Sequence, residues 1–292
     1  MPVTAQAIFD YPVPEIRQRV TTRDTILYAL SVGYGIKPLD PDHLLRTFGP
    51  VLRAVPTFAN VIAYPGPWLK DAGVDWNGVV HAEQRLELHR PLPLDVDLIS
   101  TTRMLSIVDK GPEKGMFATF ERTIRRADDA QAIATIVHTD ACRFDGGCGS
   151  AGAAPAPLPR VPTTPPDRTV CVAIPEDAAL LYRLNGDLNP LHADPVTARK
   201  AGFERPILHG LCTFGYVGYV IADSILQAGF VEPSAMAARF TAPVFPGETL
   251  AVDLWTLEPQ IRFRARVPER DCVALDCGTA GGAITPADAG ST

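Results

Sequence analysis

The sequence predicts an α+β fold made of two tandem repeats, each with a long buried helix wrapped by an antiparallel β-sheet. Three observations support this prediction. A proline-rich segment divides the 292 residues near the middle, similar patterns recur on both sides at matching spacing, and each side contains three alternating β-rich runs. The composition agrees, because 46% hydrophobic and 21% charged residues are typical of a globular chain with a sizeable core.

The first repeat begins at residues 24–35 (DTILYALSVGYG), which contain Tyr28. The stretch from Val55 to Pro65 is apolar and suits a helix better than a strand. Three β-rich runs, separated by the turn sequences KGPEKG and ADDA, follow Pro93 at residues 95–107, 114–126 and 130–143. Short turns between alternating runs indicate an antiparallel meander.

The boundary between the repeats is a linker at residues 148–168, with six prolines between Pro155 and Pro166. Proline removes a backbone donor and favours extended conformations, so this segment is typical of a semi-rigid spacer. We therefore expect an N-terminal domain over residues 1–147, a C-terminal domain over 169–281 and a flexible tail over 282–292.

The second repeat follows the order of the first. Residues 177–188 contain Tyr182, which lies 64 residues before Pro246, whereas Tyr28 lies 65 residues before Pro93. The stretch at residues 206–227 is apolar around most of its circumference, which predicts a buried helix. Three further β-rich runs follow at residues 248–257, 260–267 and 271–278.

Charge and cysteine usage exclude several classes of protein. The formal net charge is −6 and Lys and Arg form no basic run, so nothing supports nucleic-acid binding. The longest apolar stretch, Leu211 to Ala222, is too short to span a bilayer. No secretory signal is visible, and the six cysteines match neither a CxxC pair nor a zinc-site spacing. We therefore expect a cytoplasmic protein with reduced thiols and no metal.

Residues suited to proton transfer concentrate in the segment 182–210 (YRLNGDLNPLHADPVTARKAGFERPILHG). Asp187 and His192 flank a turn built around Asn189-Pro190, where the proline restricts both members of the dipeptide. Such a turn can hold a carboxylate and an imidazole around one small space, and these two groups form a minimal acid–base pair.

Two helix starts follow this turn. Asp194-Pro195 is typical of an N-cap followed by proline at the first helical position, and this helix should end at Gly202. Leu208-His209-Gly210 opens the long buried helix. The first N–H groups of a helix have no intrahelical partner and carry partial positive charge, so they can bind a carbonyl oxygen.

The same segment closely resembles the hydratase-2 motif of MaoC-like double hot-dog enzymes. The matching residues are Tyr182, Gly186, Asp187, Asn189, Pro190, His192, Asp194, Pro195 and the run Ile207 to Gly210. The downstream ARFTAPVFPGETL, residues 238–250, is also similar to that family. The resemblance implies a double hot-dog fold and reversible hydration of a trans-2-enoyl-CoA to a (3R)-hydroxyacyl-CoA, without a metal or redox cofactor.

By this resemblance the catalytic set is Asp187, His192, Asn189 and Gly210. The carboxylate and imidazole would activate a water, and the Gly210 N–H would stabilise the enolate of the thioester. Asn189 has a second interpretation as a residue that only shapes the turn.

Four residues are candidates for substrate binding. His209 is one, although a core histidine with a satisfied hydrogen bond is the interpretation we favour. Arg205 and Arg239 are candidates for the phosphates of CoA, or else solvated side chains. Phe58 is expected to line an acyl tunnel.

The tunnel expectation comes from the first repeat, which lacks the catalytic residues. Gly33 stands where the repeat would place Asp187, and VPTF at residues 55–58 replaces LHGL at residues 208–211. In related enzymes such a degenerate half makes room for a bulky acyl chain.

Two other functions remain open. Hot-dog folds also support acyl-CoA thioester hydrolysis, and a non-catalytic acyl-CoA-binding subunit would share the fold. The presence of both Asp187 and His192 favours hydration over either. The expected partner is an acyl-CoA thioester, and the resemblance makes a homodimer a further expectation.

Overall fold

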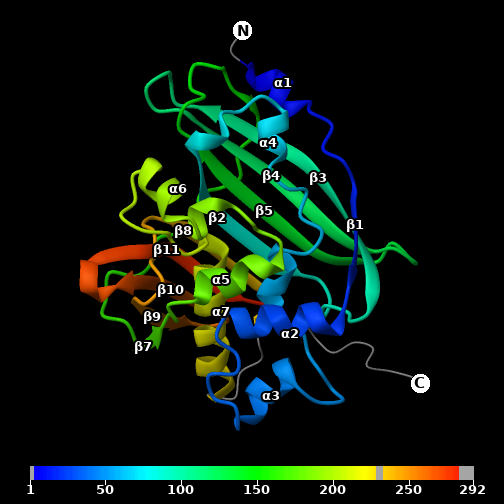
Figure 1. Ribbon diagram of the computed structural model, residues 1–292, viewed down its shortest axis with the longest axis vertical. Coiled ribbons are helices and arrows are strands. Elements are labelled where there is room, and N and C mark those ends of the chain that lie inside the picture. The colour runs from blue at the N-terminus through cyan, green and yellow to red at the C-terminus, as the bar shows by residue number, and fades with distance from the viewer. Residues whose placement is uncertain (1–2, 228–232, 283–292) are drawn as a thin grey trace.

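The computed structural model describes residues 3–227 and 233–282 (Figure 1). Its β-strands form one antiparallel sheet in the order β1-β3-β4-β5-β2-β8-β11-β10-β9-β7, with β6 paired to β3. Helix α7 packs against η1, β7 and β8, so its contacts come from both halves of the chain. This is the double hot-dog architecture that the sequence predicts.

The elements of the first half are α1 (Ala5–Phe9), β1 (Ile16–Val20), α2 (Thr22–Ser31), α3 (Pro41–Thr47), η1 (Pro56–Asn60), α4 (Trp68–Asp71), η2 (Trp76–Gly78), β2 (Val79–Leu88), β3 (Val96–Asp109), β4 (Met116–Arg126), β5 (Ala132–Cys142) and β6 (Ala151–Gly152). Those of the second half are β7 (Arg168–Ala173), α5 (Ala178–Tyr182), η3 (Arg183–Asn185), η4 (Pro190–His192), α6 (Pro195–Lys200), α7 (Gly210–Gln227), β8 (Ala235–Phe240), β9 (Thr249–Leu257), β10 (Gln260–Val267), η5 (Pro268–Arg270) and β11 (Cys272–Gly281). The six predicted β-rich runs are confirmed as β3, β4, β5, β9, β10 and β11.

The internal duplication is visible in the strand order. Outward from the central β2–β8 pair, one side runs β2-β5-β4-β3-β1 and the other runs β8-β11-β10-β9-β7. Each strand on one side therefore has a counterpart on the other. In the central pair Leu86 lies opposite Met236. Tyr28 and Tyr182, the residues that mark the repeat in the sequence, meet in the core with ring centroids 6.0 Å apart.

A matching helix start survives in both halves. The side chain of Asp40 caps α3 and that of Asp194 caps α6, and each helix has proline directly after its cap. The two caps are 154 residues apart, as are the two tyrosines of the repeat. The first half has therefore kept the local fold of this segment without counterparts of Asp187 and His192.

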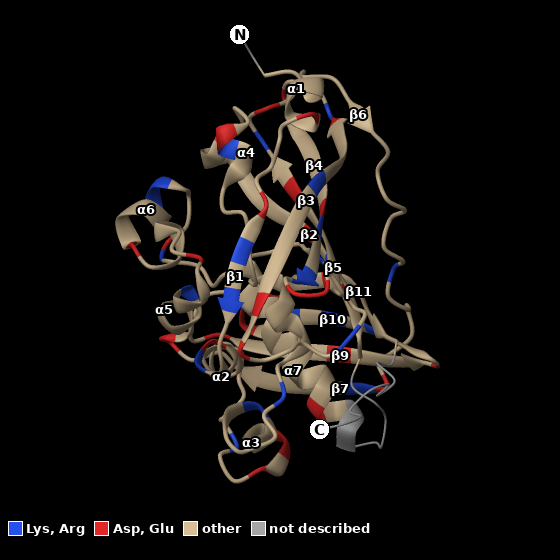
Figure 2. Cartoon of the chain, turned by 90° about the vertical axis from the view of Figure 1, so that its right-hand side faces the viewer, with Lys and Arg blue, Asp and Glu red and all other residues tan. Residues whose placement is uncertain are grey.

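The long buried helix occurs only in the second half. There α7 is almost wholly uncharged, with Asp223 as its single charged residue (Figure 2). In the first half, the stretch from Val55 to Pro65 forms only η1 and a turn. The expectation of a second long helix there is therefore wrong. The guanidinium of Arg122 donates hydrogen bonds to the carbonyls of Ala59, Asn60 and Ile62, which a continuous helix would use for its own N–H groups.

The segment expected to be a linker contains no helix or strand between residues 153 and 167. It is held to the sheet, because Arg85 donates to the carbonyl of Ala156 and the indole N–H of Trp255 donates to those of Thr164 and Pro165. The expected flexible tail, apart from its first residue, lies outside the described residues. Within residues 3–227 and 233–282, no helix is long and apolar enough to cross a membrane.

Candidate active site

Asp187, His192 and His209 meet at one place, although 22 residues of chain separate the first from the last. Each offers an oxygen or ring nitrogen within 4.8 Å of those of the other two. Asp187 follows Gly186, whose φ of 114° turns the chain in a conformation that glycine adopts readily. His192 ends η4, and His209 directly precedes α7. The predicted catalytic pair is therefore brought together with a third titratable side chain.

The turn between Asp187 and His192 is held by Asn189. Its side-chain oxygen accepts a hydrogen bond of 3.0 Å from the Leu191 N–H, which caps η4. Its own N–H donates to a carboxylate oxygen of Asp187 over 3.1 Å. Asn189 therefore shapes the turn and orients the Asp187 carboxylate, and its direct contact with a substrate stays a prediction.

His192 is buried and has a defined tautomer. Its Nδ1 lies 2.9 Å from the carbonyl oxygen of Ile207, and a carbonyl can only accept, so Nδ1 carries the proton. Burial lowers the pKa of His192 below its usual value, although the nearby Asp187 charge opposes that effect. The ring is therefore neutral near pH 7, with a free lone pair on Nε2.

His209 contacts both His192 and Asp187. Its ring stacks on that of His192 with centroids 3.8 Å apart, and its Nε2 donates to the backbone carbonyl of Asp187 over 3.2 Å. The side chain is 2% exposed, and burial followed by the neighbouring His192 lowers its pKa to about 4. His209 is therefore the core histidine that the sequence favours, and it also ties the start of α7 to Asp187.

Gly210 is the first residue of α7, so its N–H has no acceptor within the helix. A Cβ placed on Gly210 would lie 3.1 Å from an edge carbon of the Phe240 ring. The aromatic ring thus covers one side of the glycine and fixes its position. A larger residue would displace either the ring or the first turn of the helix.

The donor set also has the composition of a metal site. Nδ1 of His192 and Nε2 of His209 donate to backbone carbonyls, which leaves one lone pair on each ring and the oxygens of Asp187. Within the described part of the chain, Nδ1 of His209 is buried without a hydrogen-bond partner. These three residues would hold a divalent cation if one bound. The expectation that no metal is needed stays a prediction.

The two arginine candidates lie in different settings. Arg205 donates over 3.0 Å to the carbonyl of Pro246, and its guanidinium lies over the ring of Phe245 at 5.0 Å. Arg239 pairs with Glu83 at 3.5 Å. It precedes Phe240 in β8, and neighbouring residues of a strand point to opposite faces, so Arg239 lies on the other side of the sheet from Gly210. Contact of Arg205 or Arg239 with the phosphates of CoA stays a prediction.

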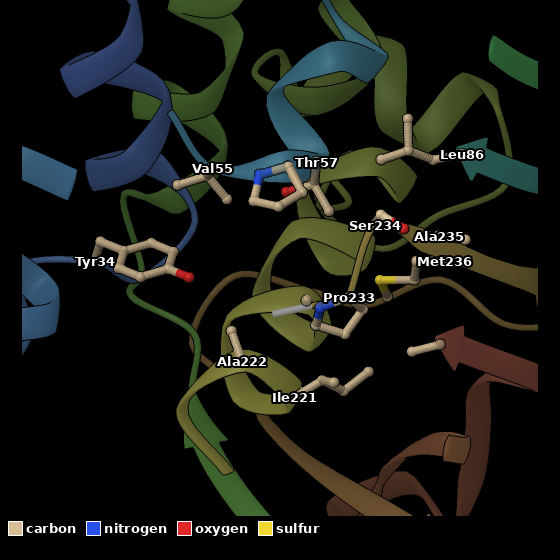
Figure 3. Close-up of a pocket in the computed structure, with 13 residues that line it drawn as sticks. Tyr34, Val55, Thr57, Leu86, Ile221, Ala222, Pro233, Ser234, Ala235 and Met236 are labelled. Carbon is tan, nitrogen blue, oxygen red and sulfur yellow. The ribbon is translucent and has the colours of Figure 1, made fainter. Parts of the chain in front are cut away.

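Phe58, which was expected to line an acyl tunnel, lies in the core. Phe58 is 3% exposed and packs in the core, with its ring centroid 5.0 Å from that of Tyr28. Its neighbours Val55 to Thr57 instead line a small apolar cavity of about 20 Å³ (Figure 3). The tight turns of η1 point these residues toward the cavity and Phe58 away from it. The remaining lining residues are Tyr34, Leu86, Gly218, Ile221, Ala222, Pro233, Ser234, Ala235, Met236 and Ala280.

This cavity and the catalytic cluster share one face of α7. Gly210 and Gly218 both face β8, because a Cβ on Gly210 would lie 3.1 Å from the Phe240 ring and a Cβ on Gly218 would lie 3.6 Å from the sulfur of Met236. Gly210 belongs to the catalytic end, and Gly218 and Ala222 line the cavity. The rise of an α-helix separates Gly210 from Gly218 by roughly 12 Å. Phe214, which is fully buried, stands between them.

A group of first-half residues lies beside this site; sequence reasoning gave His81 a structural role and missed His138 and Asp140. His81 on β2 lies 4.2 Å from Phe240 between ring centroids, and His138 on β5 stacks on His81 at 3.8 Å. Asp140 lies 2.8 Å from His138. The HTD sequence at residues 138–140 places His138 and Asp140 on one face of a strand, but only the sheet order brings that face to Phe240.

Comparison with known proteins shows two family matches along the chain. Residues 19–141 match the MFE-2 hydratase 2 N-terminal domain and residues 154–274 match the MaoC like domain. The chain is 37% identical to 3-hydroxyacyl-thioester dehydratase Y of Mycobacterium tuberculosis, over 86% of this chain and 87% of that protein. It is 34% identical to the enoyl-CoA hydratase ChsH3 of the same organism, over 93% of this chain and 96% of that protein. The crystal structure of a MaoC-like dehydratase from Phytophthora capsici superposes on this chain with a TM-score of 0.82 and 27% sequence identity. The match covers 94% of this chain and 97% of that chain.

Proposed function

Because the chain belongs to the MaoC-like, hydratase 2 family of double hot-dog hydro-lyases, we propose that it reversibly hydrates trans-2-enoyl-CoA to (3R)-hydroxyacyl-CoA. The observation that carries the proposal is the meeting of Asp187, neutral His192 and the first turn of α7. The relatives named enoyl-CoA hydratase and 3-hydroxyacyl-thioester dehydratase would run the two directions of one reaction.

The geometry supports a division of roles between Asp187 and His192. A water bound between them would give a proton to Nε2 of His192, because that nitrogen has the free lone pair. The water oxygen would bond to carbon 3 of the enoyl group while the C2–C3 π electrons move onto the thioester oxygen. Asp187 would orient the water, and the proton taken up by Nε2 of His192 would then pass to carbon 2, which completes the addition and returns His192 to its neutral form.

Gly210 would stabilise the negative charge that forms on the thioester oxygen. Its N–H belongs to the first turn of an 18-residue helix, where the partial positive charge of the helix end adds to the hydrogen bond. Donors that are already in place cost little reorganisation when the charge appears, and they contribute strongly to catalysis.

We also propose that the apolar cavity beside Thr57 and Gly218 receives the acyl chain. Its lining is mostly hydrophobic and it lies on the Gly210 face of α7. The first half contributes only the short η1 here in place of a second long helix, and side chains around the cavity of about 20 Å³ would have to move to admit an acyl chain. This refines the tunnel expectation by replacing Phe58 with its neighbour Thr57.

Crotonyl-CoA tests the reaction. Loss of the enoyl absorbance without release of free thiol supports hydration, whereas free thiol would identify a thioesterase. Chiral analysis of the product tests the (3R) assignment, and a (3S) product would contradict it.

The residue roles are tested by Asp187→Asn and His192→Gln. Each should lower kcat by about 100-fold or more, because loss of a positioned acid or base typically costs that much. Asp194→Asn is the matched control, since asparagine also caps a helix and should leave kcat unchanged. Undiminished turnover by either catalytic variant would remove this mechanism.

A further inference from the structure

A buried carboxylate–imidazole pair lies in the half that lacks the catalytic residues. Asp140 and His138 occupy alternate positions of β5, and the carboxylate oxygen lies 2.8 Å from Nε2 of the imidazole. Their side chains are nearly inaccessible, with residue exposures of 4% and 8%. A hydrogen bond in such a setting fixes the orientation of the imidazole ring, because no water competes for either partner.

The oriented ring of His138 is the first of a series of packed rings. It lies nearly parallel to His81, with centroids 3.8 Å apart and planes 20° apart, and nearly parallel to Phe120 at 4.8 Å. His81 in turn packs on Phe240 at 4.2 Å. Phe240 covers Gly210, with 3.1 Å between its edge carbon and a Cβ position on the glycine. A continuous path of close contacts therefore joins Asp140 to the start of α7.

Tyr64 links the pair of Asp140 and His138 to the proposed catalytic site. Tyr64 is 38% exposed, and the loss of solvation around its hydroxyl, then the charge of Asp140 and to a smaller extent that of Asp187, raise its pKa. Tyr64 therefore lies within the field of both carboxylates. Its ring is also 6.5 Å from that of His138. Burial and the neighbouring His138 lower the pKa of His81, so His81 meets Phe240 as an uncharged ring.

We propose that Asp140 and His138 are positioning residues for the thioester carbonyl site, acting through His81 and Phe240 on the N–H of Gly210. The proposal rests on the proposed hydration, in which that N–H binds the developing oxyanion. Such a donor must lie about 2.7–3.1 Å from the charged oxygen, so a small displacement of the helix start weakens it. The degenerate half would thus contribute to the chemistry as well as to acyl binding.

The primary test compares Asp140→Leu with Asp140→Asn. Leucine removes the hydrogen-bond acceptor for Nε2 of His138, whereas asparagine keeps a carbonyl oxygen at the same position. With crotonyl-CoA, kcat should fall about tenfold in the leucine variant and stay within about threefold of wild type in the asparagine variant, the range expected for a partly misplaced oxyanion donor. In the leucine variant the KM should rise by about the same factor as the Kd of butyryl-CoA, because both ligands present a thioester carbonyl to the Gly210 N–H, and in the asparagine variant it should stay unchanged.

A binding measurement separates positioning from loss of structure. Butyryl-CoA carries the thioester carbonyl, and S-butyl-CoA is a thioether without it. Asp140→Leu should weaken binding of butyryl-CoA and leave the affinity for S-butyl-CoA unchanged. Equal weakening of both ligands, or an unchanged kcat, would overturn the proposal.

Two further variants provide an independent test and a control for loss of stability. Phe240→Leu interrupts the same path without leaving a buried polar group unpaired, and it should give the same difference between the two ligands even if Asp140→Leu folds poorly. Asp253→Asn is the matched control, because Asp253 is a buried carboxylate that pairs with Arg264 and Arg266 away from this path. It should lower the Tm and leave kcat and both affinities unchanged. Wild-type protein inactive on crotonyl-CoA would instead refute the proposed function.

Discussion

At the scale of single residues, the site depends on two stacked histidines that are both held neutral. For His192 this leaves a lone pair for proton transfer. For His209 it allows burial against Asp187 and Tyr182, with a ring centroid 5.0 Å from that of Tyr182. Neutral rings can stack at 3.8 Å without charge repulsion. The proposed acid–base function and the local stability therefore depend on the same property, the neutral state of both rings.

The stability should fall in mild acid because of His209. Its pKa is about 4 in the folded protein and about 6.5 when unfolded, so the unfolded chain binds the proton more tightly. This contribution is complete above pH 6.5 and is lost as the pH falls toward 4. Urea unfolding should show a free energy of unfolding about 2 kcal/mol lower at pH 5 than at pH 7.

The His209→Gln variant should reduce this dependence on pH. His89→Gln, at an exposed histidine, is the matched control and should retain it. An equal slope in the His209→Gln variant and wild type would show that His209 is not the group responsible.

Removal of metal should leave hydration unchanged. The proposed mechanism assigns the proton to Nε2 of His192 and the oxyanion to Gly210, so it has no step that needs a cation. After dialysis against EDTA, kcat with crotonyl-CoA should stay within the error of the untreated enzyme. A loss of activity that zinc restores would instead identify Asp187, His192 and His209 as metal ligands.

The residues that sequence reasoning found and those that it missed differ in one physical respect. Asp187 and His192 lie on one short turn, so their meeting follows from local geometry and from a motif. His138 and Asp140 reach the site only because β5 pairs with β2 and β2 pairs with β8. The placement of Arg239 on the other face of β8 from Phe240 likewise depends on the register of the whole sheet, which the sequence alone does not give.

At the scale of elements, α7 joins two functions on one face. Its first residue would bind the thioester oxygen, and its third turn borders the apolar cavity. The sequence predicted this helix because its apolar residues cover most of its circumference. It could not predict the short η1, because the Arg122 side chain that binds the η1 carbonyls comes from β4, about 60 residues away along the chain.

Gly218→Val should shorten the range of accepted acyl chains. A Cβ on Gly218 would lie 3.0 Å from Cγ2 of Thr57 and 3.6 Å from the sulfur of Met236, so valine would fill the cavity. We expect kcat/KM for a ten-carbon enoyl-CoA to fall at least about tenfold relative to crotonyl-CoA, as for other pockets narrowed by a methyl group.

Phe58→Trp is the comparison for this prediction. Phe58 faces the core, so its substitution should change the activity on long and short substrates by the same factor. A selective loss on long substrates in Phe58→Trp, without one in Gly218→Val, would contradict the placement of the acyl chain.

At the scale of the whole molecule, the two repeats share one core. A Cβ on Gly215 of α7 would lie 2.5 Å from Cγ1 of Val32, and one on Gly33 would lie 3.0 Å from the ring of Tyr216. The backbone of each half thus lies directly against side chains of the other. The expected homodimer and cytoplasmic location stay predictions.

The chain should therefore unfold in a single transition despite its two repeats. Trp255 is the only tryptophan of the second half, and Trp68 and Trp76 report on the first. In Trp255→Phe, and separately in the Trp68→Phe/Trp76→Phe double variant, fluorescence and far-UV circular dichroism should give one midpoint in urea. Two separate midpoints within one variant would show that the halves unfold independently.

The central β2–β8 pair also has a genetic consequence. Where two identical chains form such a sheet, every substitution occurs in both chains at once. A substitution that makes room for the acyl chain in one copy would then also alter the turn of Asp187 and His192 in the other. Here each copy is encoded separately. The segment after Tyr28 could therefore diverge, with Gly33 at the matching position, while the segment after Tyr182 has Asp187 and His192, the proposed acid–base pair.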